Sequence, residues 1–502
     1  MKHLSSCLTA LALAAVAGPA GAQAALPPPG IPSVSYVNGF VLQNDWGLVR
    51  LYPRISLALD VRGTAGAGAA ELRGSDGGPE LSPRVVVRRG LAELGGGAFG
   101  FLDMDLSVEI DGRGTYGDRL LPGAHDMLVG IPNAWINAEA GPALNLMVGI
   151  QPTPFSLEHR TDPDELLSLE QSVASQLAVP FARSLGATVW GTTLHKEFGY
   201  DLMWIAAVGD TAPTSFAERG GAGRIFYRPY GLTGSRWDRL QIGVSGRWTV
   251  RDGQSADLSR VDVTTGNGFA LWDRRYVDSL GRTEAILPSG NQRALGVEVL
   301  LPTFKGLDFT GEVYVFDDNT REAVESAAAT STERLGSLQG AGWYGELSYL
   351  VAPLVPGQRQ WTPTHDVPYD RSRSLQPGLY PHPRRREAIG VPSPIDALAE
   401  LQLTLRAGRV DADYQPVRAT NQPALYGQAD AKSPGGRLDV WQVGGTVSLW
   451  WTRIFRLTAG WESYCAPGAG TPQNRATLPA QLAGTAGAPW MHEFTLRARM
   501  AL

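Results

Sequence analysis

The clearest feature of the sequence is a two-residue alternation of apolar and polar side chains that recurs along most of its length. Between 102 and 111, leucine, methionine, valine and isoleucine alternate with aspartate, serine and glutamate. Because successive side chains on a strand point to opposite faces, such a segment has one oily and one charged face. In a soluble sandwich the charged face would meet the solvent outside, whereas in an outer-membrane barrel lipid lies outside and water within.

The same alternation predicts fifteen clear strands and a weaker sixteenth at 223–230. The fifteen lie near 48–62, 82–95, 98–111, 129–140, 143–151, 184–197, 200–208, 238–251, 292–302, 306–317, 341–352, 398–411, 436–452, 454–464 and 490–502. Bacterial barrels normally close on even strand numbers, which favours sixteen. We therefore predict an all-β fold, a transmembrane antiparallel β-barrel of sixteen strands.

Short and long connections between these strands alternate. Short turns at 95–97, 141–142 and 198–199 are separated by longer segments, and in such barrels short turns face the periplasm and long loops face outward. This rhythm makes 151–184 the third outer loop, and long ordered connections are usually functional. We expect this third loop to fold into the lumen and constrict it. The connection 352–397 should be short and is long; a periplasmic excursion and a misplaced strand pair both remain open.

The N-terminus has the features of a secretory signal peptide. A charged start, an apolar run at 8–17 and small residues at 22–24 predict a signal peptide over 1–24. A periplasmic N-terminal segment would follow at 25–47 and the barrel at 48–502, which places the protein in the outer membrane. No later stretch of about 18 apolar residues is present, which disfavours a helical membrane protein.

The net charge and the absence of a dividing linker limit the possible partners and the domain organisation. The formal net charge of −5 argues against a nucleic-acid partner. No linker divides the chain into separate units, so a single large barrel fits its length better than several soluble domains.

One segment resembles a known family. Residues 148–158 read Val-Gly-Ile-Gln-Pro-Thr-Pro-Phe-Ser-Leu-Glu, and 183–187 read Arg-Ser-Leu-Gly-Ala. This is similar to the strand end and strand start that flank the third loop in the phosphate-selective porin family, the outer-membrane porin O/P type. The segments 87–89, 343–345 and 449–457 add further matches. The resemblance implies a homotrimeric channel in membrane lipid, in which arginines and lysines attract small hydrophilic solutes, inorganic anions among them.

The sequence departs from that family in its charges. Lysine is nearly absent, and the family's Glu-Arg pair in the third loop appears here as Glu170 and Gln171. Inward arginines are matched by inward carboxylates, so pairing for structure and attraction of anions both remain open. Arg88 and Arg89 cannot both face inward on a regular strand, and a bulge or a strand-end position would resolve this. The predicted pore and constriction residues are Arg88, Arg89, Glu158, Arg160, Asp162, Asp164, Arg183, Arg247 and Arg251.

No catalytic, cofactor-binding or metal-binding arrangement stands out. The glycines at 95, 97 and 100 lie in a tight hairpin with no helix after them, so a turn explains them better than a dinucleotide site. We therefore predict a non-enzymatic porin for passive diffusion of small hydrophilic solutes, with anion or phosphate selectivity as the finer expectation. The alternatives are a plugged outer-membrane barrel acting as an enzyme or surface-binding protein, and a secreted soluble β-sandwich.

Overall fold

The structure is a computed structural model of the chain. It describes residues 33–36, 40–43, 49–66, 83–99, 101–111, 128–141, 143–161, 166–178, 183–193, 197–209, 218–230, 237, 240–252, 263–267, 270–272, 275–277, 282–304, 307–327, 330–332, 334–351, 400–417, 436–451, 455–465 and 490–501. The predicted signal peptide at 1–24 and the connection at 352–397 lie outside these ranges.

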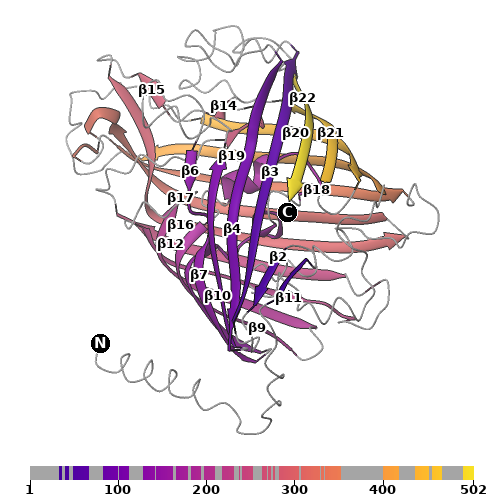
Figure 1. The fold of residues 1–502 in the computed structure, drawn as a ribbon. Coiled ribbons are helices and arrows are strands. Elements are labelled where there is room, and N and C mark those ends of the chain that lie inside the picture. Colours follow the sequence, from indigo (N-terminus) through magenta and orange to yellow (C-terminus); the bar gives the residue numbers. More distant parts are fainter. Residues whose placement is uncertain are drawn as a thin grey trace, which may run out of the picture.

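Sixteen antiparallel strands of the described chain form a closed barrel. In order around the wall they are β3 (Val49–Ala65), β4 (Arg84–Ala98), β5 (Leu102–Asp111), β7 (Ala134–Gly141), β8 (Leu144–Pro152), β9 (Arg183–Thr192), β10 (Phe198–Gly209), β11 (Glu218–Tyr227), β12 (Gln241–Arg251), β16 (Thr283–Phe304), β17 (Leu307–Val324), β18 (Arg334–Val351), β19 (Glu400–Val417), β20 (Gly436–Trp450), β21 (Phe455–Cys465) and β22 (Met491–Ala501). The last strand pairs with the first, for example Leu496 with Val61 (Figure 1). This closure confirms the barrel and rules out the β-sandwich alternative.

Shorter elements accompany the barrel. They are β1 (Ser33–Tyr36), β2 (Phe40–Gln43), β6 (Leu128–Gly130), β13 (Val263–Thr264), β14 (Ala270–Trp272), β15 (Arg275–Val277), α3 (Leu157–Arg160), α4 (Val173–Ala178) and η3 (Glu325–Ala327). The β1–β2 hairpin joins the barrel sheet through β3, where Leu42 pairs with Leu51. Among the described residues, no helix is both long and apolar enough to cross a bilayer.

The two faces of the wall are distributed as in a barrel that stands in lipid. On β5, Met104, Leu106 and Val108 point outward and are 41–51% exposed, whereas Asp105 and Glu109 point inward and are under 9% exposed. The same apolar outward band recurs on the other strands. Because an aqueous exterior would favour the opposite arrangement, the outward face has the composition of a surface covered by acyl chains.

Differences from the predicted strands have simple causes. The weak sixteenth strand is β11, which begins at Glu218, five residues before the expected start at 223. Gly220, Gly221 and Gly223 supply no side chains to alternate, so the pattern there is faint. The strand β18 pairs with β19 over nearly its whole length; the connection 352–397 therefore joins neighbouring strands, and the misplaced-pair interpretation is wrong.

Candidate functional site

The third loop leaves the wall at Pro152, and its described parts lie inside the barrel. Ser156 has a positive φ of 67°, which turns the chain into the short helix α3. The backbone N–H groups of Leu157 and Glu158 donate to the carboxylate of Glu312 on β17, at 2.5 and 3.0 Å. A wall carboxylate thus accepts hydrogen bonds that the first turn of a helix otherwise leaves unmade. This is the first anchor of the loop.

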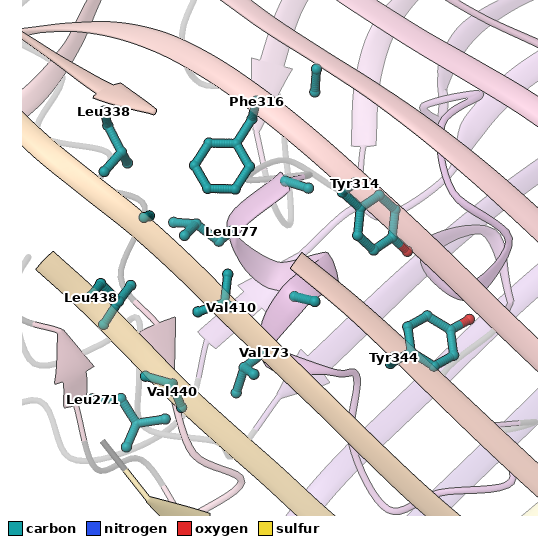
Figure 2. Packing of buried hydrophobic residues seen from close by; sticks show 14 of the residues in the cluster. Val173, Leu177, Leu271, Tyr314, Phe316, Leu338, Tyr344, Val410, Leu438 and Val440 are labelled. Atoms are coloured by element: carbon teal, nitrogen blue, oxygen red, sulfur yellow. The ribbon is translucent and has the colours of Figure 1, made fainter. Parts of the chain in front are cut away.

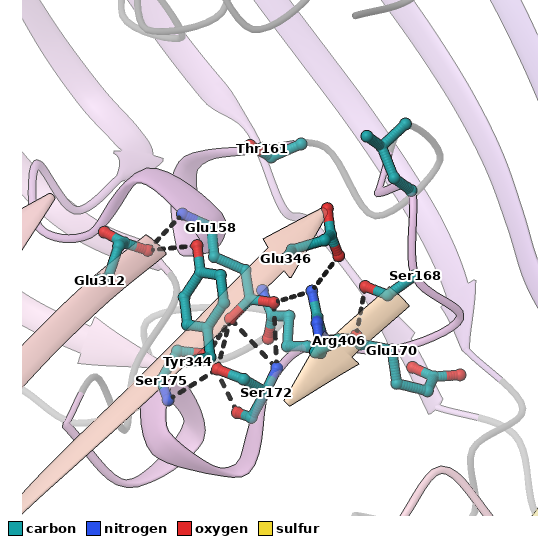
Figure 3. A network of polar contacts seen from close by, with 12 residues as sticks. Glu158, Thr161, Ser168, Glu170, Ser172, Ser175, Glu312, Tyr344, Glu346 and Arg406 are labelled. Carbon is teal, nitrogen blue, oxygen red and sulfur yellow. Dashed lines mark hydrogen bonds and ion pairs between the residues drawn. The ribbon is translucent and has the colours of Figure 1, made fainter. Parts of the chain in front are cut away.

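The second anchor is the carboxylate of Glu158 (Figure 3). It accepts hydrogen bonds from the hydroxyls of Ser172 and Ser175, both at 2.6 Å, and so joins the two halves of the loop. It also forms an ion pair with Arg406 of β19 at 2.6 Å, and Arg406 pairs in turn with Glu346 of β18 at 3.0 Å. The loop is therefore tied to the wall by a buried charge network.

The third anchor is Glu170, which meets three arginines from three adjacent strands. Its carboxylate accepts two hydrogen bonds from Arg88 at 2.8 and 2.7 Å, one from Arg497 at 2.9 Å and one from Arg62 at 3.2 Å. Burial alone would raise the pKa of Glu170, but the attraction of these arginines outweighs it and holds the pKa well below its usual range. Glu170 therefore stays ionised in the docked loop.

Arginines also hold the loop through its backbone. Arg456 donates to the carbonyl of Leu166 at 3.1 Å, Arg497 to that of Leu169 at 2.6 Å, and Arg406 to that of Glu170 at 2.6 Å. The segment 166–170 has no regular secondary structure, so its carbonyls need partners from elsewhere. The lumen arginines supply them.

An apolar patch of the inner wall receives the second helix of the loop, α4. Val173, Ala174 and Leu177 of this helix are fully buried. They pack against inward side chains of β17 to β20 (Figure 2). The wall side of this contact is Tyr314, Phe316, Leu338, Tyr344, Val410, Leu438 and Val440. Gly342 allows the approach, because a Cβ there would stand 2.9 Å from the Ala174 side chain. This part of the lumen is a hydrophobic core.

A second segment also enters the lumen: the inner hairpin, formed by the described residues of 263–272. Leu271 joins the apolar cluster around α4. The carbonyl of Gly266 accepts from Arg62, and the N–H of Asn267 donates to Glu493 of β22 at 3.1 Å. Sequence reasoning missed this segment, because nothing in its short apolar stretch distinguishes it from an ordinary outer loop.

Another part of the lumen, along β10 to β12 and the neighbouring β16 and β17, is polar and carries paired charges. Its four ion pairs, here called the polar wall, are Arg160 of α3 with Asp201 at 2.6 Å, Arg224 with Glu298, Arg247 with Asp318 at 3.3 Å, and Arg251 with Glu218 at 3.5 Å. All eight residues are less than 9% exposed. Each cation faces an anion, which supports the structural interpretation of the lumen charges. A balanced wall creates no strong field of either sign.

Several predicted site residues are brought together here. A bulge opposite Ala58 and Leu59 leaves Arg88 outside the ladder register, so Arg88 and Arg89 are both buried. Of the two arrangements that the sequence left open, the bulge is the one observed. Arg88 reaches Glu170, whereas Arg89 reaches Glu109 of β5 at 2.9 Å.

The other predicted residues divide as follows. Glu158 and Arg160 lie on α3 inside the lumen, and Arg183, at the start of β9, is partly buried. Asp162 and Asp164 lie outside the described residues. The role of Glu312 at the start of α3 could not be predicted, since its inward position is shared by many lumen carboxylates. Within the described ranges, no group of three or more His, Cys, Asp or Glu side chains is placed to hold a metal ion.

Comparison with known proteins gives no family assignment. No protein-family model matches the chain, and no curated protein sequence matches it. Among solved structures it is similar to the outer membrane channel DcaP of Acinetobacter baumannii, with 8% identity, a TM-score of 0.47, and 90% of this chain and 97% of that chain covered.

Two further solved structures have comparable similarity. An anion-selective porin from Comamonas acidovorans has 10% identity and a TM-score of 0.42, with 90% of this chain and 100% of that chain covered. A loop-deletion mutant of OmpT, an outer membrane protein of Vibrio cholerae, has 9% identity and a TM-score of 0.46, with 91% and 100% covered. We draw no conclusion from similarities at this level. The barrel is established by the strand pairing of this chain.

Proposed function

We propose that this protein is an outer-membrane channel for passive diffusion of small hydrophilic solutes, narrowed by its third loop and by the inner hairpin. The observation that carries the proposal is the division of the lumen. Helix α4 of the loop covers an apolar part of the wall, while α3 supplies Arg160 to the polar wall, along which water and solutes would pass. A charged inner wall beneath an apolar outer face is the arrangement of an aqueous barrel channel.

The charges of the polar wall support weak ion selectivity. Selectivity follows the local sign of fixed charge in a constriction, and here each arginine is matched by a carboxylate. Phosphate selectivity, which the resemblance implies, would require an excess of positive charge that the four ion pairs do not supply. We also propose that the protein lies in the outer membrane as a homotrimer, and that its signal peptide at 1–24 is cleaved.

Liposome swelling tests the channel function. Liposomes that contain the purified protein should swell slowly in a monosaccharide and not in a trisaccharide, because the described lumen side chains leave little free space. Absence of swelling with every solute, together with absence of ion conductance in planar bilayers, would overturn the proposal.

A second candidate is a barrel sealed by its loops. The near-complete burial of the polar wall favours it, since a wide aqueous path would expose these side chains. Glu170→Gln separates the two candidates, because it loosens the third loop. A channel conducts in both the wild type and the variant, whereas a sealed barrel conducts only in the variant.

A further inference from the structure

The outer surface of the barrel carries a hollow that the channel function does not use. It has a volume of about 590 Å³ and lies across β10, β11, β12 and β16. Its floor is made of glycines that face outward, Gly221, Gly223 and Gly246, and its sides are Leu202, Trp204, Trp248 and Leu295. We call this hollow the outer notch.

Strand register explains the shape of the outer notch. Gly221 pairs with Trp204 on one side and Trp248 on the other, so two large side chains flank a position that has none. Both tryptophans are 61% exposed. Below them on the same face lie Ile225 and Val244, which are 52% and 53% exposed. The notch therefore opens onto the apolar band and can receive a flexible hydrocarbon chain.

Two exposed arginines stand at the end of the notch nearer the third loop. Arg219 lies two residues above Gly221 on the same face, which is about 7 Å along a strand. Arg293 is paired directly with Trp248. Both side chains are exposed, at the end of the wall where long loops face outward.

Among the residues that the structure describes, neither guanidinium has a hydrogen bond or an ion pair. Asp317 lies opposite Arg293 in the register but accepts a hydrogen bond from Gln339 at 3.2 Å. Every arginine of the polar wall is paired, so two free guanidinium groups beside an apolar hollow are distinctive. Their planar forks suit phosphate oxygens.

We propose that the outer notch binds one phosphate-bearing lipid of the outer leaflet. An acyl chain lies over the glycine floor between Trp204 and Trp248, and Arg219 and Arg293 bind the phosphate of the headgroup. Tryptophan at the headgroup level is the usual position of this side chain in membrane barrels. The proposal requires that the barrel stand in a membrane, and it does not depend on conduction through the lumen.

Native mass spectrometry of the protein in a neutral detergent tests this proposal. The protein is titrated with phosphatidic acid, with diacylglycerol as the phosphate-free diacyl lipid, and with inorganic phosphate. We expect one phosphatidic acid to be retained per chain, at least tenfold more tightly than diacylglycerol. Displacement of the lipid by millimolar inorganic phosphate would overturn the proposal, because a free-anion site would explain it.

Variants assign the two parts of the notch. Arg219→Gln with Arg293→Gln should weaken lipid retention at least tenfold, and the corresponding double lysine variant should keep most of it. Gly246→Leu should fill the notch and abolish retention. Its Cβ would lie 3.3 Å from the end of the Leu295 side chain, which can move, and 4.0 Å from the nearest backbone atom, the carbonyl oxygen of Ala294. The barrel should therefore fold.

A matched control is Gly63→Leu on the opposite outer wall, where nothing lies within 4 Å of the new Cβ. It should retain lipid as the wild type does. Equal retention in the Gly246→Leu and Gly63→Leu variants would overturn the proposal. So would a mass shift showing that Gly246→Leu dissociates an oligomer, since the notch would then be a contact between copies of this chain.

Discussion

Replacement of Glu170 by glutamine tests how firmly the third loop is docked. The variant keeps the size of the side chain and removes its charge, while Arg62, Arg88 and Arg497 remain around it. Four hydrogen bonds of 2.7–3.2 Å to these arginines are weakened or lost. Arg62 and Arg497 keep Asp60 as a partner, at 2.6 and 2.7 Å.

The size of the effect follows from the burial of the cluster. The side chains of Glu170 and its arginines are only 1–8% exposed. Removal of one partner from a buried ion pair costs about 3–5 kcal/mol. Since about 1.4 kcal/mol is a factor of ten in an equilibrium constant, the population of undocked loop should rise by roughly two to three and a half orders of magnitude.

Hydrogen–deuterium exchange of peptides from 166–178 measures this population. The amides of Ser172 and Gln176 are hydrogen-bonded in the docked loop, and exchange reports local opening. They should exchange about 100-fold faster or more in Glu170→Gln. The control is Glu109→Gln, which removes a buried carboxylate that pairs with Arg89 of the wall rather than with the described part of the loop. Unchanged exchange in Glu170→Gln, or equal acceleration in both variants, would refute the reasoning.

Three other changes have defined outcomes. Gly342→Ala places a Cβ 2.9 Å from the side chain of α4 and should destabilise the docked helix by about 1–3 kcal/mol, seen as faster exchange of 173–178; Gly63→Ala should change nothing. Asp201→Asn removes a negative charge from the polar wall and should shift the reversal potential in a salt gradient toward anion selectivity, whereas the outward Asp317→Asn should not. The folded-state pKa of Glu170 is lowered from 4.5, so its docking energy is fully present above about pH 4.5 and is lost as the pH falls through the folded-state pKa. Exchange of the loop should therefore be unchanged near neutral pH and accelerate only in acid, a response that Glu170→Gln should flatten.

The sequence predicted the barrel well because alternation with a period of two is a local signal. The order of the strands and the inward position of charged residues such as Arg247 and Arg497 follow from it directly. The adjacent Arg88 and Arg89 indicated either a bulge or a strand-end position, and the structure has the bulge in β4. Trp450, at the end of β20, is 2% exposed, because it faces the lumen beneath Arg456.

The interior of the barrel was less predictable, because it depends on contacts between segments far apart in the chain. The interaction of Glu312 with the start of α3 joins positions more than 150 residues apart. The apolar inner face of β17 to β20 contradicts the simple expectation of a polar lumen. Val410 and Val440 face the lumen by strand alternation. Apolar side chains are stable there because they pack in one cluster with α4, and a strand pattern alone does not reveal that cluster.

Single-channel conductance in planar bilayers tests the central claim most directly. The wild type is compared with a variant in which 166–178 is replaced by a short Gly/Ser linker, after heat-modifiable gel mobility has shown that both barrels are folded. We predict small ohmic steps in the wild type and steps several times larger in the variant, because the described parts of the loop are packed inside the lumen. Equal steps in the two proteins, or no conductance in either, would contradict the account.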